Sequence, residues 1–213
     1  MDPVQVPRLR GVLHLVAAPL AVVGGLLLVM AAESGPTRWA VAIFMVTSVA
    51  LFATSATYHM GAWLPKTKAM LRRADHSNIF LIIAGTYTPL ALLLLTPTDA
   101  RTLLIIVWSG AIAGVLIRNF WLTAPRWIYV PIYVALGWAA IFYLPQFAAA
   151  GALILGLIVA GGVLYTIGAA IYAAKWPQIS KTWFGFHEMF HSFTIAGFAA
   201  HFSAVALAIV AIA

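Results

Sequence analysis

The chain has 213 residues, of which 64% are hydrophobic and 8% charged, with a formal net charge of +7. About a quarter of the residues of an ordinary soluble domain are charged, so this composition excludes a globular surface that faces water and indicates an integral membrane protein. The absence of cysteine excludes disulfides and thiolate ligands, and it leaves His, Asp, Glu or water to bind any metal.

Seven stretches predict transmembrane helices, because each approaches the roughly 20 apolar residues that a span needs. The connections between them are short, and no alternating ten-residue pattern of a β-barrel appears. The sequence therefore predicts one all-α domain, residues 1–213, built as an up-and-down bundle of seven helices. The predicted spans are residues 11–32, 39–60, 77–96, 102–122, 127–144, 150–174 and 185–211.

The basic residues predict the orientation of this bundle. Ten of the 12 Lys and Arg residues fall on the side that holds the N-terminus, and only Arg38 and Arg101 fall on the other. Cytoplasmic loops carry such an excess, so we expect the N-terminus in the cytoplasm and the C-terminus outside. The ten are Arg8, Arg10, Lys66, Lys68, Arg72, Arg73, Arg118, Arg126, Lys175 and Lys181.

The same distribution bears on partners and location. The basic residues are scattered between apolar runs, where they orient spans and meet anionic lipid head groups. We therefore expect the bilayer and no nucleic acid as a partner, and a multi-pass location in the inner or plasma membrane. The first apolar run is too long for a signal peptide and lacks a small-x-small motif before Glu33, so no cleavable signal is expected.

Two histidines open the last predicted span. His187 and His191 are four residues apart and so share one face of a helix. His59 ends the second span and Asp75 opens the third, and the predicted topology puts all four at the cytoplasmic boundary. Ionisable groups at this depth are costly unless they bind something, and neutral imidazole is the commonest metal ligand. We predict that His59, His187 and His191 bind one metal ion.

Zinc suits this ligand set, because three histidines leave one tetrahedral position open for water, and bound zinc lowers the pKa of that water to about 7. Asp75 is the candidate to accept the proton. Ser55, one turn before His59, is the candidate to stabilise a developing oxyanion. Simpler alternatives stay open: any one interfacial histidine can be merely hydrogen-bonded, Asp75 can pair with Arg72 or Arg73, and Ser55 can bond to its own helix.

Other polar residues have less defined roles. Glu188 lies between the two histidines, and H-E-x-x-H is also the metalloprotease signature, with Glu as the base. His201 follows His191 by ten residues, about 15 Å along a helix, so we place it outside the site and expect a hydrogen bond within the bundle. His14 and His76 are candidates for supporting contacts to the ligands.

Together these residues resemble the hemolysin III family, within the progestin and adipoQ receptor group of seven-span proteins. The resemblance covers nearly the whole chain. It implies a seven-helix bundle with zinc near the cytoplasmic face, in which His59, His187 and His191 are ligands, Asp75 holds the zinc-bound water and Ser55 is a nearby polar contact. The matching segments are Ser55-x-x-x-His59, Asp75-His76, Gly85-Thr-Tyr-Thr-Pro89, Gly161-Gly-Val-Leu-Tyr165 through Gly168, and Phe186-His-Glu-Met-Phe-His191.

Three functions follow from this resemblance as expectations. The wider superfamily includes alkaline ceramidases, which implies zinc-dependent hydrolysis of a membrane lipid amide or ester. The first alternative is a non-enzymatic lipid-sensing receptor or regulator of membrane homeostasis, in which zinc clamps the second, third and seventh spans. The second is a cytolytic pore or a transporter that uses the histidines as a proton relay. The ionisable groups cluster on one side, which disfavours a transport path.

Overall fold

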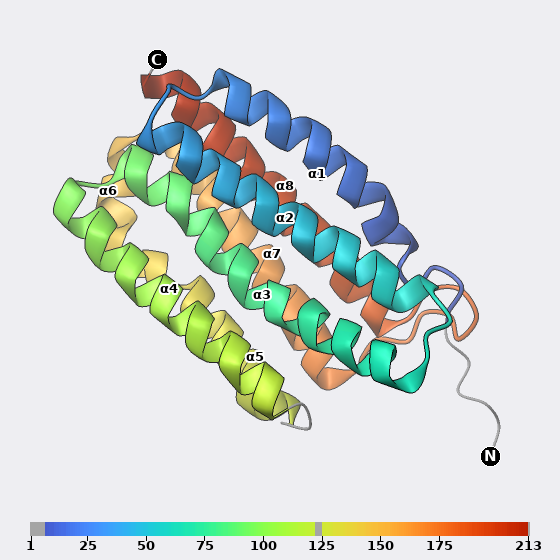
Figure 1. Cartoon of the computed structure of the whole chain (residues 1–213). Helices are drawn as coiled ribbons and strands as arrows, with labels where there is room; N and C mark the ends of the chain where they lie inside the picture. Colours follow the sequence, from blue (N-terminus) through green and yellow to red (C-terminus); the bar gives the residue numbers. More distant parts are fainter. Residues whose placement is uncertain (1–6, 122–124, 213) are drawn as a thin grey trace.

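The computed structural model describes residues 7–121 and 125–212, and over these residues every regular element of secondary structure is a helix. Seven helical segments are long and apolar enough to cross a membrane, so the predicted seven-helix architecture is confirmed. The two termini lie at opposite ends of the bundle (Figure 1), as an odd number of crossings requires. Which end faces the cytoplasm stays a prediction. The helices are α1 (Val12–Ala31), α2 (Pro36–Met60), α3 (Pro65–Leu94), α4 (Pro97–Phe120), α5 (Arg126–Gly137), the 3-10 helix η1 (Ala139–Tyr143), α6 (Leu144–Ala149), α7 (Ala152–Ala174) and α8 (Phe186–Ile212).

Helices α2, α3 and α4 each begin at a proline, whose fixed φ and missing N–H suit the first helical position. For α3 this start is Pro65, so the helix begins before the predicted span 77–96. The charged stretch 66–73, interpreted as part of a loop, forms the first turns of α3. Its basic side chains are exposed, and Lys and Arg are good helix formers, so the helix extends beyond its apolar part.

The fifth span, Arg126–Ala149, is broken into α5, η1 and α6. Its predicted end at residue 144 is too early, because a short helix continues past Pro145. Tyr87 of α3 lies at the break, where its hydroxyl donates to the Gly137 carbonyl and accepts the Ala140 N–H at 3.0 Å. In a membrane interior such backbone groups need a partner inside the protein, and Tyr87 supplies it for both.

Helix α3 is the centre of the bundle. It packs against α2, α4, α5 and α8, while α1 packs mainly on α2 and α7 packs on α8. Small residues allow the close approaches: a Cβ at Gly85 would lie 2.1 Å from Oγ1 of Thr47 on α2, and a Cβ at Gly114 of α4 would lie 2.3 Å from the Phe80 ring. This packing brings the last turns of α2, the first half of α3 and the first turns of α8 to the end of the bundle that holds the N-terminus (Figure 1). We call this the site end.

Candidate metal centre

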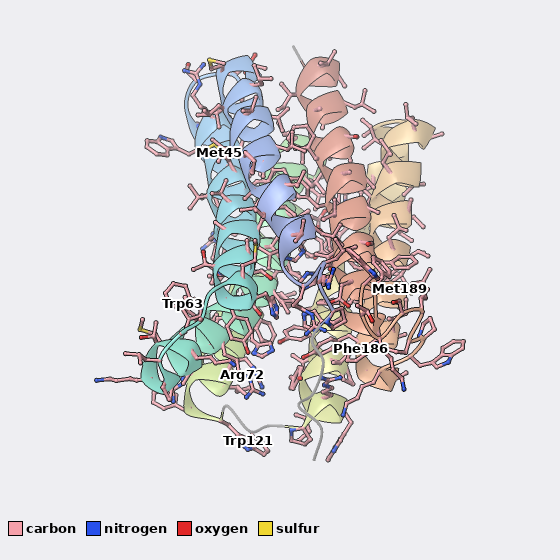
Figure 2. The ribbon with its side chains drawn as sticks, turned by 90° about the vertical axis from the view of Figure 1, so that its right-hand side faces the viewer. Met45, Trp63, Arg72, Trp121, Phe186 and Met189 are labelled. Carbon is pink, nitrogen blue, oxygen red and sulfur yellow. The ribbon has the colours of Figure 1, made fainter. Side chains whose placement is uncertain are left out.

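Three imidazoles converge at the site end. His59 lies in the last turn of α2, and His187 and His191 lie one turn apart at the start of α8. Their ring centroids are 4.7 Å apart for His59 and His187, 5.3 Å for His59 and His191, and 4.5 Å for the α8 pair. Figure 2 shows Phe186 and Met189, which flank the α8 histidines in the chain, in the lower half of the view. Trp63 and Arg72, which follow His59 in the chain, lie in the same half.

The spacing of the ring nitrogens fits a metal ion. One nitrogen from each histidine lies within 4.8 Å of the other two, and the Nε2 atoms of His59 and His187 are 3.1 Å apart. Two nitrogens that bind one tetrahedral zinc at about 2.0–2.1 Å are about 3.3–3.4 Å from each other. Small side-chain rotations would therefore suffice to place all three on one ion, and neutral imidazoles are ligands that zinc accepts.

Asp75 and Ser55 lie beside the histidines. The Asp75 Oδ2 is 3.9 Å from the His59 Nε2, and Ser55, which is 1% exposed, lines the same cavity as Asp75. Over the described part of the chain, Asp75 has no ion pair with Arg72 or Arg73, and Ser55 has no hydrogen bond to its own helix. The structure thus brings the five predicted residues together, and their roles as ligands and catalytic groups stay predictions.

A cavity of about 130 Å³ begins at these residues and runs between α3, α5, α7 and α8. Ser55, Asp75 and the α8 histidine pair line one end, and His201 lines the wall further along α8. The ten residues between His191 and His201 correspond to about 15 Å of helix. Most of the lining is aliphatic or aromatic, and it includes Ile79, Ile83, Leu90, Tyr133, Val134, Trp138 and Tyr165. The result is a long apolar cavity with a polar end.

The model of the family described as Haemolysin-III related matches residues 4–202, which include every residue of the candidate centre. The chain belongs to the hemolysin III family. It is 34% identical to the hemolysin-3 homolog of Bacillus subtilis (strain 168) over 183 residues, which cover 84% of this chain and 82% of that protein. It is 30% identical to hemolysin-3 of Bacillus cereus over 199 residues, which cover 92% of this chain and 88% of that one. The predicted resemblance to the hemolysin III family is therefore confirmed.

In this hemolysin III family member, Glu188 binds other groups of the protein and is not part of the histidine cluster. Its carboxylate is 0% exposed, one oxygen pairs with the Arg10 guanidinium, and the other accepts the Gly185 N–H at 2.7 Å. An acidic side chain in the first turn satisfies free backbone N–H groups and complements the helix dipole. These contacts give Glu188 a structural role at the start of α8, and the metalloprotease interpretation of H-E-x-x-H does not fit them.

The remaining histidines have distinct surroundings. The His14 ring of α1 stacks on the His191 ring with centroids 3.8 Å apart and planes 9° apart, and its ring nitrogens have no hydrogen-bond partner among the described residues. His201 Nε2 lies 3.0 Å from the Ile158 carbonyl oxygen and donates to it. The predicted hydrogen bond of His201 within the bundle is thus confirmed, and His14 packs against one of the candidate ligands, His191.

Sequence reasoning missed Arg118. It was interpreted as a loop charge, but it lies in α4, is 1% exposed and packs its guanidinium over the Tyr129 ring at 4.4 Å. Its Nη2 is 3.0 Å from the His76 Nδ1. Because arginine can only donate, this contact makes Nδ1 the acceptor and puts the proton of a neutral His76 ring on Nε2. For a single arginine at the end of an apolar run, the local sequence does not indicate whether the side chain points into the bundle or away from it.

Proposed function

We propose that this protein is a zinc-dependent hydrolase that acts on an amide or ester bond of a membrane lipid. The observation that carries the proposal is the three-histidine cluster with Asp75 and Ser55 at the polar end of a long apolar cavity. A metal site with an open ligand position is typical of catalytic rather than structural zinc. The cavity provides the place where a lipid chain would lie.

The chemistry divides between the metal and the chain. Zinc bound by three imidazoles supplies an activated water at neutral pH. Asp75, whose Oδ2 is 3.9 Å from the His59 Nε2, would accept a proton from a water beside the cluster. The Ser55 hydroxyl lines the same end of the cavity, where it would donate to the carbonyl oxygen of the substrate as negative charge develops.

The cavity explains how a lipid would be held. Its walls from α3, α5, α7 and α8 are mainly apolar, so an acyl chain can lie along them while the carbonyl group reaches the polar end. Burial of the acyl chain also removes water from the reacting groups, which strengthens the electrostatic interactions there. Since the helices are embedded in lipid, the substrate would enter from the bilayer.

The test is a turnover assay with purified protein in lipid nanodiscs, using ceramide and phospholipid with and without a zinc chelator. We expect turnover that the chelator abolishes and that added zinc restores. His191→Ala should lose turnover and bound zinc, whereas Ser203→Ala, on the same helix with its hydroxyl bonded to the Ala199 carbonyl, should retain both. Turnover that survives in His191→Ala would reject the mechanism.

A specific observation also favours a second function, a lipid-sensing regulator with structural zinc. Helix α2 packs on α1 and α3, and α8 packs mainly on α7, so the histidine cluster is the place where the end of α2 meets the start of α8. A metal there would clamp two helices that otherwise pack on different neighbours. In that case removal of the metal would lower thermal stability. Neither the wild type nor Asp75→Asn would hydrolyse any lipid.

A further inference from the structure

We infer that residues 8–14, the N-terminal strap, position the three imidazoles for metal binding. This inference rests on the proposed metal centre and names the residues that would set its geometry. The strap consists of the turn that precedes α1 and the first turn of α1. It contacts the end of α2 and the start of α8, the two segments that carry the histidines, through three separate interactions.

The first interaction is the ion pair between Arg10 and Glu188. Glu188 lies between the two α8 ligands, and its second oxygen holds the Gly185 N–H at 2.7 Å. The carboxylate is fully buried while Arg10 is partly exposed. A buried carboxylate tied to both a backbone amide and a guanidinium has little freedom, so the pair fixes the rotation of the first turn of α8 and with it the directions of His187 and His191.

The second interaction joins the strap to α2. Gly11 adopts a φ of 84°, and a Cβ at this position would lie 2.7 Å from the Met60 Cγ and 3.0 Å from the His59 Cβ. The strap backbone therefore lies directly against the ligand residue of α2. Only glycine meets both requirements, because the positive φ and the missing side chain are needed at the same residue.

The third interaction is the stack of His14 on His191, with ring planes 9° apart. The stack limits the tilt of the His191 ring. The strap is itself anchored to the segment before α8, since the Arg8 N–H donates to the Thr182 carbonyl at 2.8 Å and the Arg8 guanidinium lies 4.9 Å from the Trp183 ring centroid. Each histidine of the cluster is thus restrained, directly or through Glu188, by the strap.

These contacts make Arg10 and Glu188 positioning residues. Neither belongs to the set of nitrogens that could hold the ion, but both fix the elements that present those nitrogens. Groups that orient metal ligands in this way typically contribute about 10- to 100-fold to metal affinity. They also account for the glutamate of H-E-x-x-H, which is held by an arginine 178 residues away in the chain.

The experiment measures the zinc affinity of the purified full-length protein by competition with a chelator of known affinity. Arg10→Ala should bind zinc about 10- to 100-fold more weakly than the wild type, and Arg10→Lys should recover part of the loss. The matched control is Arg73→Ala, which removes an exposed arginine from α3 at the same end of the bundle and should leave the affinity unchanged. If Arg10→Ala does not fold, Glu188→Gln replaces it, because Gln keeps the size and can still accept the Gly185 N–H.

A second measurement separates the failure of this inference from failure of the proposed function. Amide hydrogen exchange of residues 182–191 should be faster in Arg10→Ala than in the wild type, whether or not zinc is present. A wild type that binds no zinc contradicts the proposed function. Unchanged exchange in Arg10→Ala, or a zinc affinity equal to that of the wild type, contradicts the role of the strap alone.

Discussion

The site end and the rest of the bundle differ in the polar groups that meet across helices. Through the middle and far part of the bundle, Ser and Thr hydroxyls mostly bond to carbonyls of their own helix, and among the described residues the polar contacts between helices there involve at most one ionisable side chain, as in the contact of His201 with the Ile158 carbonyl. At the site end, pairs of ionisable side chains meet across helices or segments. The local bonds are those of Thr47, Ser48, Thr86 and Thr88, and the contacts between helices or segments join His59 to His187, His59 to Asp75, Arg118 to His76 and Arg10 to Glu188.

This difference distinguishes polar side chains that only satisfy hydrogen bonds within the fold from those that are able to bind a ligand. A polar group inside a membrane costs several kcal/mol if it is left without a partner, and a bond to the preceding helical turn removes that cost without any other element. The ionisable side chains at the site end instead need partners from distant segments, so the fold must bring those segments together. Convergence of three imidazoles, each able to bind a cation, is the arrangement that a metal would stabilise.

The largest effect that would sharpen this contrast is expected for Asp75→Asn. The amide keeps the shape of the side chain but is a much poorer proton acceptor, so lipid turnover should fall by about 10²- to 10⁴-fold, while bound zinc and thermal stability change little. Turnover and zinc content are measured on the same preparations.

The matched control is Asp99→Asn, which makes the same chemical change at a partly exposed residue of α4 in the other half of the bundle, where Asp99 bonds to Thr96 and Gln146. It should leave turnover unchanged. Equal losses in the two variants, or full activity in Asp75→Asn, would remove the catalytic distinction between the two halves of the bundle.

An intermediate effect is expected where the bundle is held by packing alone. Gly85→Ala should lower the free energy of unfolding by about 1–3 kcal/mol, because the new Cβ would lie 2.1 Å from the Thr47 Oγ1 and force α2 and α3 apart. Gly156→Ala is the control, since nothing lies within 4 Å of a Cβ there. Thermal unfolding in detergent compares the two, and equal midpoints would contradict the close approach of α2 and α3.

The smallest effect is expected in the apolar wall of the cavity. Gly162 lines it, and a Cβ there would lie 3.7 Å from the Trp138 ring, an ordinary contact distance. Gly162→Leu should therefore fold normally but occupy space needed by a long acyl chain, which raises KM about 10-fold for long-chain lipids and leaves kcat nearly unchanged. A short-chain substrate should be insensitive to the change. A fall in kcat with KM constant would place the substrate elsewhere.

The sequence was sufficient to predict the seven spans and the convergence of His59 with the α8 histidines. Apolar runs fix the number of helices, and an up-and-down order puts the end of the second span at the depth at which the seventh begins. The four-residue spacing of His187 and His191 then requires one shared face. These inferences depend on local patterns and on topology, and both are visible without coordinates.

Contacts between distant segments could not be predicted in this way. The pairing of Arg10 with Glu188, the turn of Arg118 into the bundle and the bonds of Tyr87 to the broken fifth span all join residues far apart in the chain. The start of α3 was missed for another reason, because charged residues beyond the membrane can continue a helix without any apolar pattern. The depth of a residue in the membrane can be predicted from hydropathy, whereas the residue that it contacts depends on three-dimensional packing.

The most direct test of the metal centre is X-ray absorption spectroscopy combined with elemental analysis of the purified protein. The account predicts one zinc ion per chain, bound by three imidazole nitrogens at about 2.0–2.1 Å and one oxygen, and loss of this signal in His59→Ala. Absence of any bound divalent metal, or a metal whose spectrum contains no imidazole ligands, would contradict it.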